Sequence, residues 1–460
     1  MTVVDSPNGV MAERSLDRYR AGRKESQQLW ERARGVLPGG VSGAAKYYAP
    51  FPVFLASAHG ASATDVDGND YIDLLMGAGP MLLGHGHPRV LEAVREQVGW
   101  MTNPMLPTEL SVELAERMRG HMPHLERLRF TNTGSEATRS AVRVARAVTG
   151  RTLVAKCEGA FHGSDDMFLV SAHTRVVAGS KGRPLPVVDY PGLQPGVQES
   201  VLVLPYNDPR AAAELIDEHA SELACVIVEP VAFSSGGGVP ATPEFAQALH
   251  EATGRHDVVL IFDEVLCAYR LGLAGAPPLL GVMPDLAAIG KAVGGGMPLA
   301  AFGGRAELME AALARDEDLS PRGVHPPRQI FQSGTFTENP VAMAAGLAVL
   351  DVLESEPVLE RADRTGELLR SGLGELFLTH GVTAAVTGTA SIAQVHIGVE
   401  RVENRRDVLR ADPEATRAFL LGMVAEGVLW PPGHPALTSG AHTLADIEQV
   451  ITIAGTVLSG

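Results

Sequence analysis

The sequence predicts an α/β protein, with a doubly wound, mostly parallel sheet and a smaller α+β domain at its C-terminal end. Two observations predict the sheet: short apolar runs that do not alternate with polar residues, and helical stretches between those runs. Strands of a parallel sheet are covered on both faces, so their side chains need not alternate. Helices between consecutive strands supply the crossovers that parallel pairing requires.

The length of 460 residues fits about two to three domains of ordinary size. We expect an N-terminal helix and extended arm over residues 1–60, a large α/β domain over 61–330 and a small α+β domain over 331–460. The arm includes a Pro- and Gly-rich stretch, which disfavours regular structure.

The elements expected along the chain can be given in order. In the large domain, strands are expected over 128–131, 153–156, 201–204, 224–228 and 258–262, with helices over 137–149 and 243–252. Long loops are expected over 180–200 and 314–332. In the small domain, helices are expected over 341–353, 413–426 and 444–458, around strands near 382–386 and 392–397.

Composition excludes several classes of protein. Apolar residues make up 45% and charged residues 20%, which is typical of a folded globular chain. The formal net charge of −16 disfavours nucleic acid as a partner. No apolar stretch approaches the ~18 residues of a membrane span, and no signal-peptide core precedes residue 24, so we expect a cytoplasmic enzyme. The cysteines Cys157, Cys225 and Cys267 lie far apart, which predicts neither a disulfide framework nor a metal site.

A first candidate site lies where a strand meets a helix. Thr133 and Glu136 have the T-x-x-E spacing of a capping box, and Gly134 and Ser135 form the turn between them. A strand that leads through such a turn into a helix N-terminus can bind a phosphate, because free N–H groups and the helix dipole both favour an anion. An ordinary capped helix is the alternative reading of the same residues.

Two further segments bear charged residues next to apolar strands. Asp263 closes an apolar run, and Val265, two residues later, leaves the same face of the strand. A carboxylate beside an apolar surface suits a protonated heterocyclic nitrogen. Lys291 lies between an apolar run and the glycines 294–296, and a buried lysine has the lowered pKa that Schiff-base chemistry needs. A strand-end cap and a plain glycine turn are the alternatives.

An aromatic residue completes the set. Phe161 follows the expected strand 153–156 and could stack on a ligand ring. A phosphate cradle, an acid for a ring nitrogen, an aromatic ring and a lysine for an aldehyde are together the parts that pyridoxal 5'-phosphate requires.

At these residues the chain resembles the class III (fold type I) pyridoxal-phosphate aminotransferases, in particular the branch similar to glutamate-1-semialdehyde aminomutase. The resemblance runs from about Gly39 to the C-terminal end. Its motifs are Asp65–Asp73, Gly84–Pro88, Thr133–Ala137, Phe161–Gly163, Val228–Pro230, Asp263–Val265, Lys291, Ser333–Phe336 and Asn339–Pro340.

The resemblance implies a role for each matched residue. Lys291 would hold the cofactor as a Schiff base and move the proton, and Asp263 would keep the pyridine nitrogen protonated. Phe161 and Val265 would lie on the two faces of the ring. The remaining cofactor-binding residues implied by the resemblance are Thr133, Gly134, Ser135, His162, Glu229 and Thr335. Because Thr335 would come from a second subunit, the resemblance also implies a homodimer with shared active sites.

The residues expected to bind the substrate differ from those of the aminomutase-like branch. The arm at Gly39–Lys46 lacks the Ser-Pro-x-Arg of aminomutases. The C-terminal substrate wall, Trp430–His434, lacks their glutamate. Residues 48–52 look like β-phenylalanine aminotransferases, yet the arginines of those enzymes are replaced by Gly43 and Pro432. Ser234 stands where many class III enzymes have a gating glutamate. The remaining candidates for substrate binding are Lys46, Tyr48, Arg270 and His434.

From these residues we expect an aminotransferase. It would move an amino group between an amino acid (a β-amino acid included) or amine and a 2-oxo acid, with pyridoxamine phosphate carrying the group in between. The alternative is the intramolecular amino shift of glutamate-1-semialdehyde 2,1-aminomutase. A non-catalytic scaffold is disfavoured because Lys291 and Asp263 are both present, and a nicotinamide dehydrogenase because Arg89 stands where the third Gly of G-x-G-x-x-G belongs.

Overall fold

The computed structural model describes residues 7–173, 175–312 and 330–459, which form two compact units. One unit consists of residues up to 87, 357–402 and 407 onward, and the other of residues 88–356 and 403–406. We call them unit 1 and unit 2. The domain boundaries expected near residues 60 and 330 stay a prediction. Most of the expected loop 314–332 lies outside the described residues.

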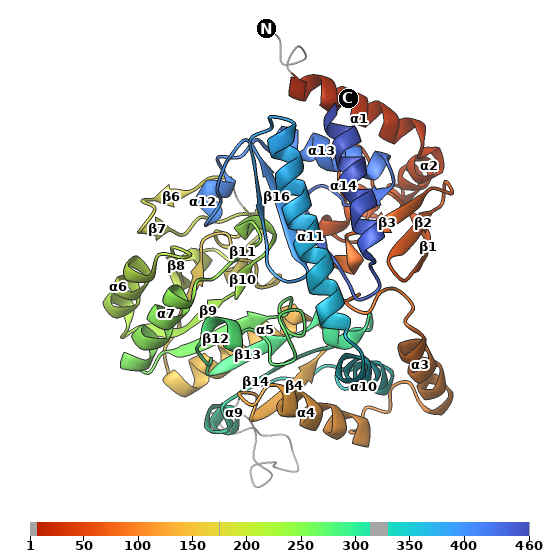
Figure 1. Ribbon diagram of the computed structural model, residues 1–460. Coiled ribbons are helices and arrows are strands. Elements are labelled where there is room, and N and C mark those ends of the chain that lie inside the picture. The colour runs from red at the N-terminus through yellow and green to blue at the C-terminus, as the bar shows by residue number, and fades with distance from the viewer. Residues whose placement is uncertain (1–6, 174, 313–329, 460) are drawn as a thin grey trace. The chain divides into compact units, whose positions relative to one another are not determined.

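Unit 2 contains a seven-stranded sheet in the order β4-β14-β13-β12-β9-β5-β8 (Figure 1). All neighbouring pairs are parallel except the two made by β14, which runs antiparallel to β4 and to β13. The sheet strands are β4 (Arg127–Thr131), β5 (Leu153–Cys157), β8 (Val201–Leu204), β9 (Leu223–Val228), β12 (Val259–Glu264), β13 (Leu286–Ile289) and β14 (Ala300–Gly304). The expected mostly parallel α/β fold is confirmed.

Helices pack on this sheet and next to one another. Helix α5 packs across β13, β14 and β9, and α6 lies beside α7 (Figure 1). The helices of unit 2 are α3 (Pro88–Trp100), α4 (Glu109–His121), α5 (Gly134–Thr149), α6 (Pro209–His219), α7 (Pro243–Arg255), α8 (Pro277–Leu280), α9 (Ala306–Ala312) and α10 (Pro340–Ser355). Short strand pairs join β6 (Ala178–Gly179) to β7 (Pro184–Leu185) and β10 (Val231–Ala232) to β11 (Val239–Pro240).

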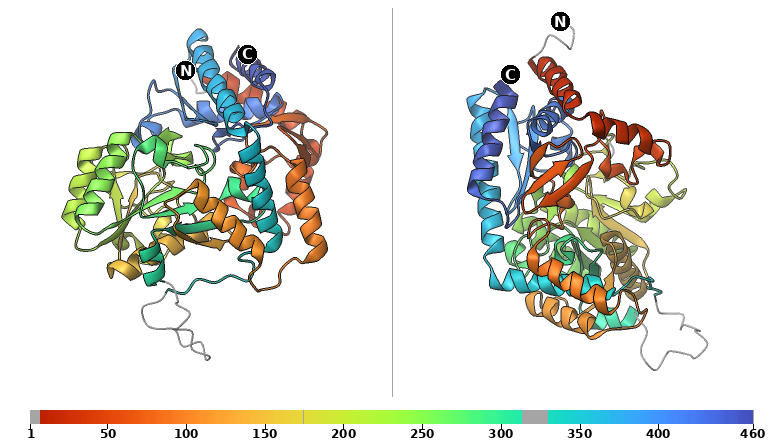
Figure 2. Two further views of the ribbon diagram at one scale, coloured as in Figure 1. Left: turned by 60° about the horizontal axis from the view of Figure 1, so that its bottom comes forward. Right: turned by 90° about the vertical axis from the view of Figure 1, so that its right-hand side faces the viewer.

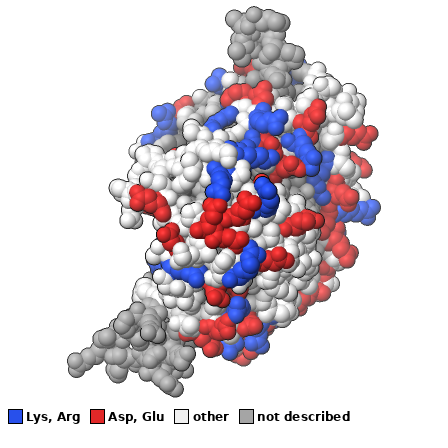
Figure 3. Space-filling view, turned by 90° about the vertical axis from the view of Figure 1, so that its left-hand side faces the viewer, with Lys and Arg blue, Asp and Glu red and all other residues white. Residues whose placement is uncertain are grey.

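The core of unit 2 lies between α5 and the sheet. Ala141, Val144 and Ala145 of α5 are fully buried in one cluster with strand residues that include Ile227 and Ile261. This contact fixes the first turn of α5 relative to the strand ends. Positive and negative side chains are interspersed on the face of the molecule where α6 and α7 lie (Figure 3). Between these two helices, Arg255 of α7 donates to Asp217 of α6 at 2.8 Å.

Unit 1 combines two small sheets with helices. The sheets have the orders β1-β2-β3-β17 and β15-β16-β18, and the long helices α11 and α14 lie side by side (Figure 2). Its strands are β1 (Leu55–His59), β2 (Ser62–Asp65), β3 (Asp70–Asp73), β15 (Ala384–Thr387), β16 (Ile392–Ile397), β17 (Val428–Leu429) and β18 (Ala436–Leu437). Its helices are α1 (Pro7–Ala21), α2 (Lys24–Ala33), α11 (Val358–Thr379), α13 (Pro413–Ala425) and α14 (Leu444–Ser459), and the short α12 (Arg405–Val408) begins in unit 2.

Candidate active site

Five segments meet at one edge of the sheet in unit 2. Strands β5, β9, β12 and β13 run parallel, and β4 runs the same way because β14 is antiparallel to both β4 and β13. Ligands of open α/β sheets bind at the carboxyl ends of the strands. The residues at or just after these ends are Thr133–Ser135, Phe161–His162, Glu229, Asp263–Val265 and Lys291.

The start of α5 lies where the anion cradle is expected. The Thr133 hydroxyl accepts a hydrogen bond from the Glu136 backbone N–H at 3.2 Å, and the Glu136 carboxylate accepts from the Thr133 N–H at 3.2 Å. The predicted capping box is therefore confirmed. A cavity of about 590 Å³ beside this turn is lined by Thr133, Ser135 and Arg139, together with the acidic residues Glu136, Asp165 and Asp166. Since first-turn N–H groups lack partners within the helix, the cradle suits a phosphate.

Gly134 allows a close approach between the cradle and Val265. A Cβ at Gly134 would lie 2.6 Å from Cγ1 and 2.9 Å from Cγ2 of Val265, much closer than ordinary van der Waals contact. The side chain of Val265 therefore lies directly against the backbone of the helix start. An apolar surface is thereby placed beside the candidate phosphate site, as a bound heterocycle requires.

Asp263 is held by His162. Both residues are buried, and the Asp263 Oδ2 atom lies 2.8 Å from the His162 Nδ1 atom. The other carboxylate oxygen accepts from the Val265 N–H at 3.1 Å. Burial lowers the pKa of His162, and the hydrogen bond to Asp263 opposes that shift. The imidazole thus orients the carboxylate, and we assign His162 to holding Asp263.

Lys291 lies two residues after the last residue of β13, and the end of β13 pairs with the end of β12. Burial lowers the pKa of its ammonium, while the carboxylates of Asp263 and Glu229 raise it. The Nζ atom lies 4.9 Å from the centre of the Phe233 ring. The backbone of Lys291 has φ of 48°, which is uncommon for a residue other than glycine and often marks a functional position. A lysine with a lowered pKa is suited to attack an aldehyde.

Glu229 joins two loops of the site. Its carboxylate accepts from the Phe161 N–H at 3.0 Å and from the Phe233 N–H at 3.4 Å. Burial and the nearby Asp263 carboxylate raise the pKa of Glu229 well above its ordinary value. The sequence analysis did not identify Phe233, since no motif includes it. Its place beside Lys291 depends on the hydrogen bond from its N–H to Glu229, four positions earlier.

The assembled residues fit pyridoxal 5'-phosphate. Phe161 keeps 39% of its surface exposed, so its ring is accessible to a ligand. Val265 against Gly134 provides apolar surface, Asp263 is an oriented acid, and Lys291 is the amine. These are the groups that the phosphate, the ring nitrogen, the ring faces and the aldehyde of this cofactor each need.

Residues 43–444 match the family model of the class-III aminotransferases. The chain belongs to this family. The cofactor of this chain is therefore pyridoxal phosphate. The members of the family are enzymes that act on small molecules.

Relatives of this class III enzyme carry several names. Glutamate-1-semialdehyde 2,1-aminomutase from Methanosarcina acetivorans is 38% identical over 93% of this chain and 96% of its own length. An omega-transaminase from Sphaerobacter thermophilus has 36% identity, a TM-score of 0.86 and coverage of 96% of this chain and 98% of its own. A glutamate-1-semialdehyde-aminomutase from Pseudomonas aeruginosa shares the fold with a TM-score of 0.87, 24% identity and coverage of 98% of both chains.

The expectation of an aminotransferase as the leading function is wrong. Eight curated relatives, 35–39% identical over most of this class III chain, are all glutamate-1-semialdehyde 2,1-aminomutases, which favours the alternative. The physical reason is that both reactions use the same lysine, acid and phosphate cradle. The choice between them had rested on residues that are absent from the arm and the wall.

The residues expected to bind substrate lie in both units. In unit 1, Lys46 is exposed, the Tyr48 hydroxyl accepts from the Val53 N–H at 3.0 Å, and His434 Nε2 lies 2.8 Å from the Ala45 carbonyl oxygen. In unit 2, Arg270 is fully buried, and its charge lowers the pKa of Lys291. The arm and the wall are thus joined within unit 1, whereas Arg270 belongs to the interior of unit 2. Substrate binding by these residues stays a prediction.

Two features are absent from the part of the chain that the structure describes. No helix among them is both long and apolar enough to cross a membrane. No group of three or more His, Cys, Asp or Glu side chains in this part of the chain is arranged to hold a metal ion.

Proposed function

We propose that this protein is a glutamate-1-semialdehyde 2,1-aminomutase. The observation that carries the proposal is the identity of 35–39% to eight curated aminomutases, over 92–97% of this chain. The reaction would move the amino group of glutamate 1-semialdehyde from carbon 2 to carbon 1 and leave the carbonyl at carbon 2. Substrate and product are isomers, so neither a second amino donor nor an oxo-acid acceptor is consumed.

The described residues support the proton chemistry of this reaction. When bound, pyridoxal phosphate withdraws electrons from the carbon that bears the amino group. Asp263, oriented by His162, would hold a proton on the ring nitrogen. Lys291 would take the proton from one substrate carbon and return a proton to its neighbour, since its lowered pKa leaves the amine free to act as a base.

Other residues of the cradle would bind and orient the cofactor. The first turn of α5 at Thr133–Ser135 would bind the phosphate, and Phe161 and Val265 would contact the ring. Glu229 would keep the turn at Phe161 in place through its hydrogen bond to that backbone N–H. We assign no step of the reaction to Glu229 itself.

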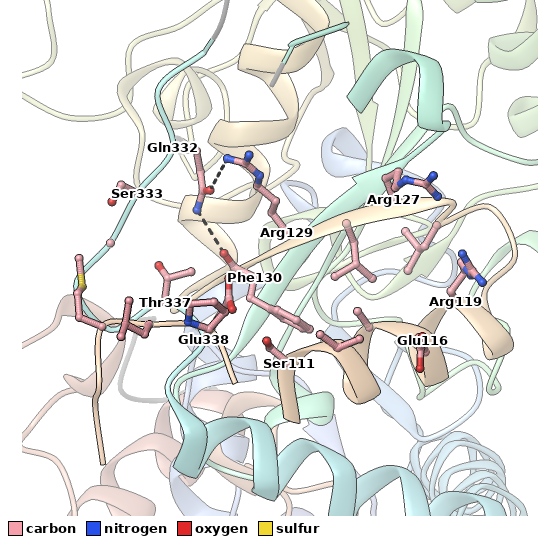
Figure 4. Close-up of a pocket in the computed structure, with 18 of the residues that line it drawn as sticks. Ser111, Glu116, Arg119, Arg127, Arg129, Phe130, Gln332, Ser333, Thr337 and Glu338 are labelled. Carbon is pink, nitrogen blue, oxygen red and sulfur yellow. Dashed lines mark hydrogen bonds between the residues drawn. The ribbon is translucent and has the colours of Figure 1, made fainter. Parts of the chain in front are cut away.

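We further propose that the protein is a homodimer in which Thr335 of the partner subunit completes the phosphate site. Thr335 and Phe336 are exposed, and Phe336 keeps 61% of its surface accessible. Next to this segment lies a pocket of about 620 Å³ (Figure 4), lined by Met105 and Leu106, which are 64% and 72% exposed. Clustered exposed apolar side chains are typical of surfaces that bind another protein. Leu106→Glu should yield monomers in sedimentation analysis and weaken cofactor binding, whereas a monomeric parent protein would contradict the dimer.

One experiment separates the aminomutase from an aminotransferase. The purified protein, loaded with pyridoxal phosphate, is given glutamate 1-semialdehyde alone, and 5-amino-4-oxopentanoate is measured by mass spectrometry. We expect full conversion without any added amino donor, and none with Lys291→Ala. Turnover that requires an added donor and releases an oxo acid would contradict the proposal.

A further inference from the structure

Two loops carry the aromatic residues next to Lys291 and the expected cofactor site. The first loop, residues 158–173, follows β5, and the second, residues 233–238, joins β10 to β11. In the first, the His173 ring packs against the Phe161 ring with 5.1 Å between centres. In the second, Phe233 contacts the Lys291 ammonium and bonds to Glu229, and Ser235 follows two residues later. The position of Phe161 over a ligand ring therefore depends on the first loop, and the surroundings of the lysine depend on the second.

Arg405 binds both loops with one guanidinium group. Its Nη2 atom donates to the His173 carbonyl oxygen at 3.0 Å, and its Nη1 atom donates to the Ser235 carbonyl oxygen at 3.0 Å. The residue is only 7% exposed. Hydrogen bonds from a charged donor are stronger than neutral ones, and the planar fork of arginine fixes the distance between its two acceptors.

The aliphatic part of Arg405 contacts a third segment of the site. A Cβ at Gly159 would lie 2.8 to 3.0 Å from the Cβ, Cγ and Cδ atoms of Arg405, and Gly159 has φ of +82°. Both the conformation and the space at this position therefore require glycine. Gly159 lies two residues before Phe161, and its N–H donates to the Ser171 carbonyl at 2.7 Å, which ties it to the loop of His173.

The segment that carries Arg405 is anchored independently of these contacts. Residues 403–406 belong to unit 2, although the chain on both sides of them belongs to unit 1. Arg406 forms a two-pronged ion pair with Glu158 at 2.8 and 3.0 Å and donates to two further backbone carbonyls. Asn207 donates to the Glu403 carbonyl at 3.4 Å. Arg405 is thus presented from a fixed backbone rather than from a free loop end.

We propose that Arg405 is a positioning residue of the cofactor site, which sets the places of Phe161 and Phe233 by binding the backbone of both loops. Arg405 would act through the backbone carbonyls of His173 and Ser235, to which it donates hydrogen bonds. The proposal depends on the binding of pyridoxal phosphate in this unit and holds for any reaction that the site performs.

The test compares Arg405→Gln with a matched arginine. Arg151 donates to the backbone carbonyls of Leu223, the first residue of β9, and of His256 and Asp257, which precede β12. These carbonyls lie at the amino ends of the two strands and therefore away from the cofactor edge. Titration with pyridoxal phosphate and circular dichroism in the visible band of the bound cofactor are the readouts, beside the melting temperature. We expect Arg405→Gln to raise the dissociation constant by about tenfold or more and to alter the circular dichroism, because it removes both charged hydrogen bonds and each such bond is worth about a factor of ten.

The control and the conservative variant make the interpretation specific. Arg151→Gln should lower the melting temperature and leave cofactor affinity and circular dichroism at parental values. Arg405→Lys, which can reach one carbonyl but not both, should give an intermediate dissociation constant. Parental affinity and circular dichroism in Arg405→Gln, with only a lower melting temperature, would overturn the proposal.

A second variant covers the case in which Arg405→Gln does not fold. His173→Leu keeps the backbone carbonyl but removes the ring that contacts Phe161, and it should alter the circular dichroism in the same direction. If His173→Leu instead matches the parent in both readouts, the route through Phe161 is wrong and the proposal falls. A parent protein that binds pyridoxal phosphate but does not convert glutamate 1-semialdehyde would contradict the proposed function alone.

Discussion

Replacing Gly134 by alanine should disturb the candidate site by a calculable steric effect. The new Cβ would lie 2.6 Å from Val265 Cγ1, whereas ordinary contacts begin at 3.4 Å. The Val265 side chain must therefore retreat by about 1 Å, and overpacking of this kind costs about 1–3 kcal/mol. The backbone at Gly134 is already helical and its φ is not positive, so the cost does not come from backbone strain.

The assay has two parts, both on the purified protein. Urea unfolding without cofactor measures the free energy of unfolding, which should fall by about 1–3 kcal/mol in Gly134→Ala. An absorption titration measures the dissociation constant for pyridoxal phosphate, which should rise about tenfold because the ring loses its apolar contact. The matched control is Gly374→Ala in α11, where nothing lies within 4 Å of the added methyl group. This control should leave stability unchanged or raise it by about 0.5–1 kcal/mol.

A double variant makes the reasoning refutable. Val265→Ala alone removes the methyl groups that the new Cβ would meet, so the pair Gly134→Ala with Val265→Ala should be destabilised less than the sum of the two single changes. Contacting residues typically show coupling of about 0.5–3 kcal/mol. Strictly additive effects would show that the two side chains do not meet, and the assignment of Val265 to the cradle would be wrong.

Three further predictions concern charged residues. Borohydride trapping followed by mass spectrometry should locate the cofactor on Lys291, and Lys291→Ala should bind the cofactor more weakly and lose all turnover. Asp263→Asn keeps the shape of the acid without its charge and should lower kcat by about a hundredfold or more, with a dissociation constant measured in parallel to show that cofactor still binds. Burial raises the pKa of Glu264 to about 8 from its ordinary 4.5, so the folded parent must lose stability as pH rises between these values. Glu264→Gln should remove that loss, and identical pH profiles of melting temperature in parent and variant would contradict it.

The parts of the site that the sequence predicts are those with a local signal. Thr133 and Glu136 show the capping box by their spacing alone, and Asp263 and Lys291 each follow an apolar run, so parallel pairing places them at one edge. The antiparallel direction of β14 has no such signal, because an apolar strand reads the same in both directions. The partner of His162 is equally hidden, since Asp263 is 101 positions away.

Contacts between distant segments limit the prediction further. Arg405 lies far along the chain from His173 and Ser235, and its bonds are to backbone carbonyls, which no side-chain pattern reveals. The sequence around Arg405 and Arg406 looks like an exposed charged turn, yet both guanidinium groups bind inside unit 2. Arginine can satisfy backbone acceptors wherever the fold brings them, so only the tertiary structure reveals this role.

The reaction itself was mispredicted for a physical reason that applies to the whole site. In the proposed mechanism Lys291 and Asp263 would act on the bond between the substrate's amino-bearing carbon and its proton, and that bond is the same in an amino transfer and in an amino shift. The outcome depends on whether the substrate is retained until its amino group has moved, and therefore on groups that bind its carboxylate. The arginines missing at Gly43 and Pro432 do not identify those groups, because Lys46, His434 or backbone N–H groups can also bind a carboxylate. An absent side chain excludes one way of binding, whereas the reaction is determined by the groups that are present.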